Sequence, residues 1–472
     1  MELTFYGAAG TVTGSKFLLK TEQGLNILID CGMYQGETDP LNKLESNMLP
    51  FNAEDIDYVL LTHAHIDHSG LLPLLAKKGF RGTVYCTAPT LDLIEMMLYD
   101  SAYIQAQDLK YINRARQQKD LPEIEALYSP EDVARILDKT KVLEEERTLN
   151  LHNHVFVKQY NNGHIIGSVG FHVTVKEKGN QQTSLYFTGD IGRKNDPILR
   201  DPIPFRQADY IICESTYGDR IHPPVTDVEP MLLNLIYETC VEKKGKIVIP
   251  AFSVDRTQEI IYLIDRMHHF GKLPKINVYI DSPMSVRATR LIKKHVKEFN
   301  PQILEYISKD GDPFCFPNLH YIESIEDSKA IDTDPNPGII ISASGMAEAG
   351  RVKHHIKNLI HDPNNLLLFV GYATPHSLAG KIKSGAENVR IFGEYFDVKA
   401  RVASLDYFSA HADYQEMIEY LSCLDPTIVK GLFLVHGRDE TRAHFANRLR
   451  AVGYNTVHLP KLNDTYILNT QS

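Results

Sequence analysis

Short apolar runs alternate with polar turns over residues 1–90, again between residues 155 and 213, and once more after residue 397. Runs of this length, bounded by turn residues, are typical of β-strands. The last of them, residues 429–435, is followed by a helical pattern at about residues 440–452. The pattern predicts one sheet-rich domain that is assembled from the two ends of the chain.

The middle of the chain has a different pattern, in which continuous apolar runs alternate with helix-like stretches. Strands that are apolar on both faces and separated by helices are typical of a buried parallel sheet. We therefore expect an α/β domain at residues 216–396, inserted into a first domain that comprises residues 1–215 and 397–472. The clearest runs of the inserted domain are residues 246–250, 276–280, 338–342 and 366–370.

Residues 90–147, which lie between the strand-like parts of the first domain, are predicted to be helical. Ser129 and the following proline and carboxylates predict a helix start, because serine caps a helix and proline fits its first turn. A tyrosine stripe at Tyr99, Tyr103 and Tyr111 lies in the first half of this region. We interpret the stripe as a packing face rather than a surface on which nucleic-acid bases stack, although a few such contacts stay open.

Composition limits the class of protein. The 472 residues include 43% hydrophobic and 23% charged side chains, ordinary values for a chain that is long enough for two to three domain-sized units. No run is long and apolar enough to span a membrane, and the six cysteines are scattered without a CxxC pair. We expect reduced cysteines and a cytoplasmic protein with no membrane association.

The net charge of −10 argues against a protein that coats nucleic acid indiscriminately. This charge is unevenly distributed. Residues 216–396 hold 21 Lys and Arg against 22 Asp and Glu, a net charge of −1, and the other residues carry the remaining −9. Any surface that binds phosphate groups is therefore expected mostly within residues 216–396.

The most informative motif is the hexapeptide HAHIDH at residues 63–68, directly after a short apolar run. On extended backbone, residues two apart point the same way, so His63 and His65 can bind one metal ion. Asp67 and His68 follow at the turn and can bind a second ion. These ligands suit zinc and tolerate iron or manganese. A histidine-rich surface turn is the alternative, and the position after an apolar strand argues against it.

Three more candidate ligands stand in turns at the ends of apolar runs. His164 lies in a glycine turn between two such runs, and Asp190 and His436 each end a run. Loops at the carboxyl ends of strands are where open sheets collect functional residues. Each of these residues alone would be an ordinary turn residue, but together with residues 63–68 they complete two metal sites.

The order of these motifs resembles the metallo-β-lactamase fold and, within it, the β-CASP family of nucleases. The likeness extends from the glycine-rich segment at residues 7–15 to Gly437. It is strongest to the RNA-cleaving branch typified by the endonuclease subunit of the cleavage and polyadenylation specificity factor and its bacterial relatives. The resemblance implies an α/β fold, a metallo-β-lactamase αββα sandwich with an inserted β-CASP α/β domain.

The resemblance also implies two zinc ions and a role for each candidate ligand. The first ion would be bound by His63, His65 and His164, and the second by Asp67, His68 and His436, with Asp190 bridging the two. Asp30, which ends an apolar run, matches the first motif of the family. It is expected to orient a ligand loop rather than to bind metal.

Three further motifs define the β-CASP family, and Glu214, His411 and His436 match them in chain order. RNA processors of the family carry histidine at the third motif and DNA processors an aliphatic residue, so the resemblance implies RNA as substrate. We expect His411 to protonate the leaving ribose oxygen, because imidazole is a natural proton donor near neutral pH. Glu214 would hold the other ring nitrogen, and Asp67 is the third residue with an expected catalytic role.

Four loops at the ends of the middle strands resemble β-CASP signature loops. Each places small or hydroxyl residues before a helix, whose exposed N–H groups suit phosphate oxygens. Ordinary strand-to-helix connections are the alternative for any one of them. The candidate substrate-binding residues in these loops are Ser253, Arg256, Ser282, Ser344, Arg351 and Lys381.

The function predicted from the sequence is hydrolysis of single-stranded RNA by a zinc-dependent endoribonuclease in RNA processing or decay. One alternative is a thioesterase or lactonase on the same scaffold, against which the size of the inserted segment argues. Another is a non-catalytic subunit of an RNA-processing complex, against which the full ligand set argues. The sequence leaves open whether the enzyme is an endonuclease or a 5′-exonuclease, which metal it uses and whether it forms a homodimer.

Overall fold

The computed structural model describes residues 1–36, 40–176, 181–222, 228–371, 373–405 and 407–468. The chain divides into two compact units. Unit 1 is formed from both ends of the chain and unit 2 from its middle. Unit 1 comprises Met1–Asn195, Asp201–Ile221 and His411–Ser472, and unit 2 comprises Asp196–Arg200 and His222–Ala410.

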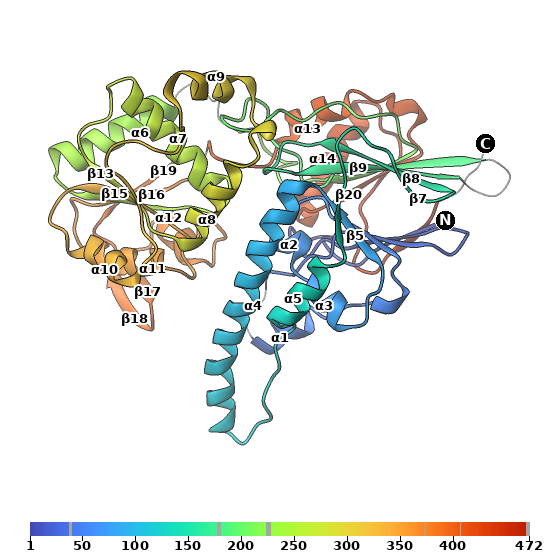
Figure 1. Ribbon diagram of the computed structural model, residues 1–472, viewed down its shortest axis with the longest axis horizontal. Coiled ribbons are helices and arrows are strands. Elements are labelled where there is room, and N and C mark those ends of the chain that lie inside the picture. The colour runs from blue at the N-terminus through green and yellow to red at the C-terminus, as the bar shows by residue number, and fades with distance from the viewer. Residues whose placement is uncertain (37–39, 177–180, 223–227, 372, 406, 469–472) are drawn as a thin grey trace. The chain divides into compact units, whose positions relative to one another are not determined.

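Unit 1 contains two seven-stranded sheets (Figure 1). The first sheet consists, in spatial order, of β22 (Thr465–Ile467), β1 (Glu2–Phe5), β2 (Phe17–Lys20), β3 (Asn26–Ile29), β4 (Tyr58–Leu60), β5 (Thr83–Cys86) and β6 (Thr140–Val142). The second consists of β21 (Val457–His458), β20 (Gly431–Val435), β11 (Tyr210–Glu214), β10 (Gln182–Phe187), β9 (Val169–Lys176), β8 (Val155–Asn161) and β7 (Leu149–His152).

The core of unit 1 lies between these two sheets. Phe5 and Ile29 of the first sheet belong to the same buried apolar cluster as Phe171 and Phe433 of the second. Leu432, the neighbour of Phe433 in β20, belongs instead to a cluster on the other face of the second sheet, with side chains of α13 (Tyr414–Leu421) and α14 (Asp439–Ala451). Because successive side chains of a strand point to opposite faces, β20 is apolar at every position and is covered on both sides.

The other α-helices among the described residues of unit 1 lie between β3 and β6 in the chain. They are α1 (Pro40–Glu45), α2 (Ile66–Ser69), α3 (Leu72–Lys77), α4 (Ala88–Gln117) and α5 (Pro130–Leu137). α5 begins where the sequence predicts, with a capping box between Ser129 and Asp132. With helices on the outer sides of two facing sheets, unit 1 is the expected αββα sandwich.

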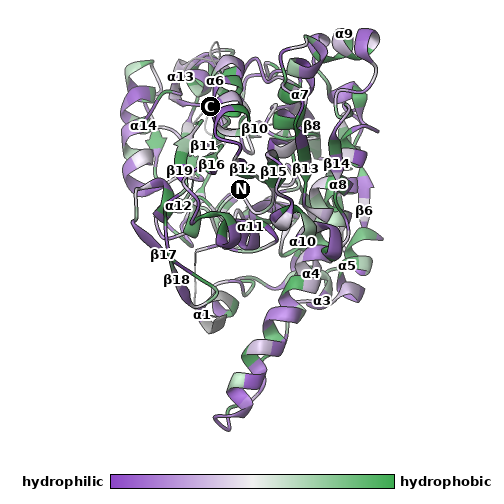
Figure 2. Ribbon diagram, turned by 90° about the vertical axis from the view of Figure 1, so that its left-hand side faces the viewer, coloured by the Kyte–Doolittle hydropathy of each residue, from purple (hydrophilic) through white to green (hydrophobic). Residues whose placement is uncertain are grey.

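Unit 2 is built on one parallel sheet, and its four predicted strands are confirmed. The sheet consists of β14 (Leu319–Tyr321), β13 (Asn277–Ile280), β15 (Gly338–Ser342), β12 (Lys246–Pro250), β16 (Leu366–Phe369) and β19 (Arg401–Ser404). The helices are α6 (Val228–Ile236), α7 (Arg256–His269), α8 (Pro283–Ile292), α9 (Pro301–Asp310), α10 (Ile325–Thr333), α11 (Val352–Leu359) and α12 (Leu378–Lys383). A hairpin of β17 (Asn388–Ile391) and β18 (Glu394–Asp397) completes the unit. Figure 2 shows these strands as largely hydrophobic and many helix surfaces as hydrophilic.

Three details differ from the sequence-based expectations. The chain returns to unit 1 at residue 411 rather than at 397, because β19 pairs with the edge strand β16 of the inserted sheet. The short segment Asp196–Arg200 belongs to unit 2, where Leu199 forms a bridge with Phe299. Residues 140–142 form the edge strand β6 instead of a helix, because they pair with β5.

The tyrosine stripe is the fourth difference. In α4, Tyr103 is 63% and Tyr111 78% exposed, so these side chains do not pack against the unit as expected.

Two other expectations concern the described residues as a whole. No described helix is both long and apolar enough to cross a membrane. All six cysteines are free, and four of them are buried.

Candidate metal centre

The HAHIDH segment leaves β4 and turns into α2, with His65 at the N-terminal cap of that helix. Three imidazole rings converge there. Nε2 of His63 lies 3.1 Å, and Nε2 of His164 3.2 Å, from Nδ1 of His65. His63 and His164 are buried, and His164 comes from the loop between β8 and β9. These three residues therefore form one side of the candidate centre.

Asp190 stands between this histidine group and a second one. One carboxylate oxygen, Oδ2, lies 3.5 Å from Nε2 of His63, 3.5 Å from Nε2 of His164 and 3.4 Å from Nε2 of His68. The other oxygen, Oδ1, lies 3.6 Å from Nδ1 of His436. The second group is completed by Asp67, whose Oδ2 lies 3.4 Å from Nε2 of His436.

This donor set fits metal ions. Donor atoms bound at about 2.1 Å to a tetrahedral ion lie about 3.4 Å apart, close to the spacings observed here. Oδ1 of Asp190 is buried and has no hydrogen-bond partner among the described residues. Because buried polar atoms are normally satisfied, this oxygen fits the role of a metal ligand. His63, His65, His164 and Asp190 form one group of close donor atoms, and Asp67, His68 and His436 another.

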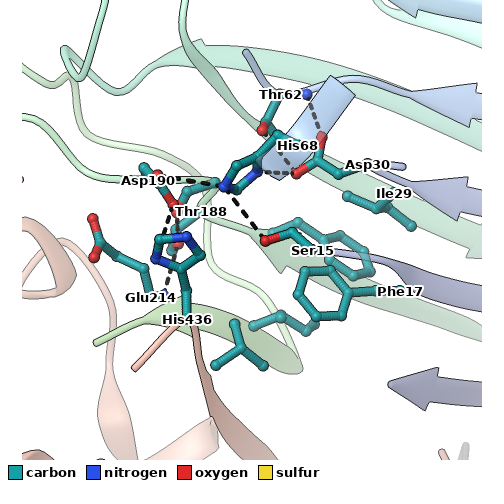
Figure 3. Close-up of a pocket in the computed structure, with 14 residues that line it drawn as sticks. Ser15, Phe17, Ile29, Asp30, Thr62, His68, Thr188, Asp190, Glu214 and His436 are labelled. Carbon is teal, nitrogen blue, oxygen red and sulfur yellow. Dashed lines mark hydrogen bonds and ion pairs between the residues drawn. The ribbon is translucent and has the colours of Figure 1, made fainter. Parts of the chain in front are cut away.

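A second layer of polar side chains holds these rings in place (Figure 3). Asp30 lies 2.7 Å from Nδ1 of His68, on the opposite side of the ring from Asp190. Its carboxylate also accepts hydrogen bonds from the amide and the hydroxyl of Thr62, at 2.8 and 2.9 Å. The Thr62 hydroxyl lies 3.0 Å from Nδ1 of His63, and that of Thr216 3.0 Å from Nδ1 of His436.

Thr62 and Thr216 are functional candidates that the sequence reasoning missed. Thr62 directly precedes His63, and Thr216 lies two residues after Glu214, but a threonine carries no metal-binding signal of its own. Outer partners of this kind set the ring orientation and basicity of metal-binding histidines. The signal that could have found them is a hydroxyl residue beside a motif residue at a strand end.

The electrostatics of the site favour cation binding. Burial lowers the pKa of His63 well below its usual value and that of His65 to about 4, so both rings are neutral, the form that binds metal. Burial alone would raise the pKa of Asp190, but the surrounding imidazoles, His436 and His68 first, hold it well below its usual range. Burial alone would lower the pKa of His68, but the charges of Asp190 and Asp30 raise it.

Beside this cluster, the structure brings together two residues that are 197 positions apart in the sequence. Nδ1 of His411 lies 3.0 Å from Oε1 of Glu214 and 4.0 Å from Oδ2 of Asp190. Glu214 ends β11, is buried, and accepts hydrogen bonds from the amides of Ile191 and Thr216. Burial alone would lower the pKa of His411, but the charge of Glu214 and its hydrogen bond raise it to about 9.

The six candidate substrate-binding residues all belong to unit 2, and the side chains of three of them form hydrogen bonds or ion pairs with other residues of that unit. Arg256 forms a buried ion pair with Glu259, one turn along α7. Arg351 donates to Oδ1 of Asp281 at 2.6 Å and to the carbonyl of Glu323 at 2.7 Å. Ser282 caps α8 by accepting a hydrogen bond from the amide of Ser285.

The other three candidates have accessible side chains. Lys381 is exposed on α12, and Ser253 and Ser344 are half-buried. The Ser344 hydroxyl donates to the carbonyl of Ala349 over 3.4 Å, a weak contact that a ligand can replace. Phosphate contacts are therefore more accessible at these three residues than at Arg256, Ser282 and Arg351.

The sandwich, the converging histidine and aspartate side chains and the inserted parallel-sheet unit define a metal-dependent hydrolase of the metallo-β-lactamase fold. Residues 18–200 match the model of the metallo-β-lactamase superfamily domain, and residues 257–382 that of the Beta-Casp domain. Residues 395–460 match the model described as a Zn-dependent metallo-hydrolase RNA specificity domain. The chain belongs to the β-CASP family of these hydrolases.

Three relatives span nearly the whole chain. The protein named ribonuclease TTHA0252 of Thermus thermophilus is 35% identical over 440 residues, which are 93% of this chain and 94% of the relative. A protein of Methanosarcina mazei named transcription termination factor FttA is 30% identical over 456 residues, 95% of this chain and 68% of the relative. An RNase J-like protein of Methanocaldococcus jannaschii is 28% identical over 450 residues, 94% of each chain.

Proposed function

We propose that this protein is a zinc-dependent endoribonuclease that hydrolyses phosphodiester bonds of single-stranded RNA. The observation that carries the proposal is the donor set around Asp190, with the Glu214–His411 pair beside it at 3.0 Å. A metal site of this kind hydrolyses many esters, so the choice of RNA rests on the match to an RNA specificity domain and on the relatives named as ribonucleases.

Two zinc ions fit the donor set. His63, His65 and His164 would hold one and Asp67, His68 and His436 the other, with Asp190 shared between them, since its Oδ2 lies near Nε2 of both His63 and His68. Bound there, divalent ions lower the pKa of water and neutralise the charge that develops on the attacked phosphate. Asp30, Thr62 and Thr216 keep the histidine rings oriented for this task.

His411 supplies the proton for the leaving ribose oxygen. Glu214 lies 3.0 Å from Nδ1 of this ring, and in the proposed reaction Nε2 is the atom that donates the proton. Glu214 is itself fixed by two backbone amides, so the imidazole is held in one orientation and its charged form is stabilised. The pair thus positions a proton donor at the edge of the candidate centre.

The test is cleavage of a 5′-labelled single-stranded RNA by protein of measured zinc content, with and without a chelator, beside a DNA of the same sequence. Asp67→Ala should lose zinc and activity together. His411→Ala should keep the zinc of the wild type and lose most of the turnover. His152→Ala, which removes an exposed histidine from β7 of the same unit, is the matched control and should behave as wild type.

The products distinguish the alternatives. Internal cuts that need zinc and His411 establish an endoribonuclease, and release of the labelled mononucleotide alone would indicate a 5′-exonuclease. Wild-type cleavage by the His411→Ala protein would refute the proton-donor role. A zinc-loaded protein that hydrolyses thioesters or lactones but not RNA would instead be a small-ester hydrolase.

A further inference from the structure

Helix α4 of unit 1 continues far beyond its packing. Its buried residues all lie in the first half of the helix, and the last of them is Ala102. The 15 residues from Tyr103 to Gln117 add about 22 Å of helix at 1.5 Å per residue without burying a side chain. In Figure 1 this outer half projects from the rest of the unit. Helices are normally stabilised by an apolar face that packs, so this exposed length calls for another explanation.

The segment that follows α4, at residues 122–124, contacts one side of the outer half. The side chain of Asn113 donates from Nδ2 to the backbone carbonyl of Ile124 at 2.9 Å, and its Oδ1 accepts from the backbone amide of Ile124 at 2.9 Å. Nε of Arg116 donates to the carbonyl of Pro122 at 2.7 Å. These contacts brace the projecting helix from the side of Asn113 and Arg116.

The side of the helix next to Asn113 carries exposed aromatic and basic side chains. At 100° per residue, Lys110, Tyr103, Arg114 and Tyr111 lie about 20°, 40°, 60° and 120° around the helix from Tyr99. We call these five residues the α4 face. Tyr99, Tyr103 and Tyr111 are 38%, 63% and 78% exposed. Figure 2 shows hydrophilic and hydrophobic residues side by side along the helix.

The charge of the α4 face differs from that of the chain. Of its five residues, Lys110 and Arg114 are positively charged and none is negatively charged, in a protein of net charge −10. Lys110 and Arg114 form no ion pair with any carboxylate among the described residues, so both are available to an anionic partner. Exposed aromatic rings interspersed with cations are the features that bind single-stranded nucleic acid by stacking and phosphate contact.

A protein partner fits this face less well. The core of a protein interface is typically depleted of lysine, whereas here the cations lie between the tyrosines. Ile104 is the one aliphatic residue among the exposed large hydrophobic side chains between Tyr99 and Tyr111. A second copy of the helix would bring Lys110 and Arg114 against like charges, which favours RNA over self-association.

The base of α4 is fixed to the loop that carries His164. The hydroxyls of Thr87 and Thr90 both donate to the carbonyl of Gly167, at 2.7 and 3.0 Å. A Cβ on Gly167 would lie 2.7 Å from Cβ of Pro89, so only glycine permits this close approach. Tyr103 and Tyr111 therefore stand on a rigid arm about 22 to 35 Å along the helix from its start beside the metal centre.

We propose that the α4 face is an RNA exosite, which holds a single-stranded segment of the substrate outside the metal centre. The proposal rests on RNA being the substrate, as argued above. An RNA long enough to reach both places gains affinity from the α4 face, whereas a short RNA bound only at the metal centre does not.

The first test is binding of a labelled single-stranded RNA to the full-length protein, measured by fluorescence anisotropy in a His411→Ala background. This readout needs no cleavage, so it separates failure of the exosite from failure of the proposed catalysis. With an RNA of about 40 nucleotides, Tyr103→Ala/Tyr111→Ala should raise the Kd about tenfold or more, because each base that stacks on a tyrosine ring contributes to the affinity. Tyr103→Phe/Tyr111→Phe keeps the rings and should bind as the parent does.

The salt dependence of RNA binding tests the contribution of Lys110 and Arg114. Lys110→Ala/Arg114→Ala should reduce the slope of log K against log salt by about 1.4, since each phosphate contact with a single strand contributes about 0.7. With an RNA of about 6 nucleotides, none of these variants should change KM or kcat of the otherwise wild-type enzyme. Circular dichroism checks that α4 stays helical in each variant.

Two results would overturn the proposal. One is an unchanged Kd for the long RNA in the Tyr103→Ala/Tyr111→Ala protein. The other is a change of molecular mass in solution from dimer to monomer in the same variant, which would identify a second copy of the chain as the occupant of the α4 face.

Discussion

A buried histidine in unit 2 makes the stability of that unit depend on pH. His355 of α11 lies between two carboxylates, with Nε2 2.6 Å from Oδ2 of Asp281 and Nδ1 2.5 Å from Oδ1 of Asp332. Asp281 also pairs with Arg351 and accepts from the hydroxyl of Ser328. Burial alone would lower the pKa of His355, but these two carboxylates raise it to about 9.

The magnitude follows from the shift. The pKa of His355 rises from 6.5 to about 9. At 1.36 kcal/mol per pKa unit, this rise corresponds to about 3 kcal/mol of stabilisation of the folded protein with His355 protonated. Because the folded pKa exceeds the unfolded one, this stabilisation is fully present below about pH 6.5 and is lost as the pH rises through about 9. The lowered pKa of Asp281 reflects the same contacts and is not added to it.

The assay compares the wild type with His355→Gln, a variant that cannot take up a proton. Urea unfolding is followed by far-ultraviolet circular dichroism, since the chain has no tryptophan, at a fixed zinc concentration from pH 6 to 9.5. The variant should be less stable by about 3 kcal/mol at pH 6 and by less than about 0.5 kcal/mol at pH 9.5.

The exposed His361 of the same unit supplies the control, and His361→Gln should differ from the wild type equally at all pH values. A His355→Gln deficit that is the same at pH 6 and pH 9.5 would refute the reasoning, because the loss would then come from packing rather than from the charge of the imidazolium. The difference between two proteins at each pH removes any effect of pH on zinc binding that they share.

Two further predictions concern the backbone of unit 2 and the metal centre of unit 1. Asp255→Gly should raise the free energy of unfolding by about 1 kcal/mol, since Asp255 has a φ of +62° in a tight turn closed by a 2.8 Å bond from the amide of Arg256 to the carbonyl of Val254. Asp255→Ala keeps the strain and should show no gain in the same urea titration. Thr216→Val should weaken zinc binding about 10- to 100-fold, because it removes the hydroxyl 3.0 Å from Nδ1 of His436. Competition with a chromophoric chelator measures the affinity, and an unchanged value would contradict the positioning role of Thr216.

The sequence by itself determined the elements whose signal is local. A continuous apolar run such as residues 338–342 has one stable environment, a strand buried on both faces, and it forms the centre of the unit 2 sheet as expected. The cap of α5 also follows from adjacent residues, because Ser129 and Asp132 interact within one turn. The HAHIDH segment marks a metal site through residue type and spacing alone.

Tertiary structure decided what depends on contacts between distant residues. Whether Arg351 meets a substrate or Asp281 cannot be read from the loop that carries it, because the partner comes from another strand. The strand at residues 401–404 joins the inserted sheet because β16 offers it a free edge, a fact absent from its own composition.

The same reason explains the tyrosines of α4 and the pair of Glu214 and His411. An amphipathic stripe is equally compatible with packing and with exposure, and only the folded chain shows that nothing covers Tyr103 and Tyr111 among the described residues. Nδ1 of His411 comes within 3.0 Å of Oε1 of Glu214 because the segment that follows His411 is held beside the end of β11. The amide of Ala412 donates to the carbonyl of Ile191, and Asp413 forms a bridge with Tyr217. Local sequence determines which elements form, and the packing of elements far apart in the chain determines which side chains meet.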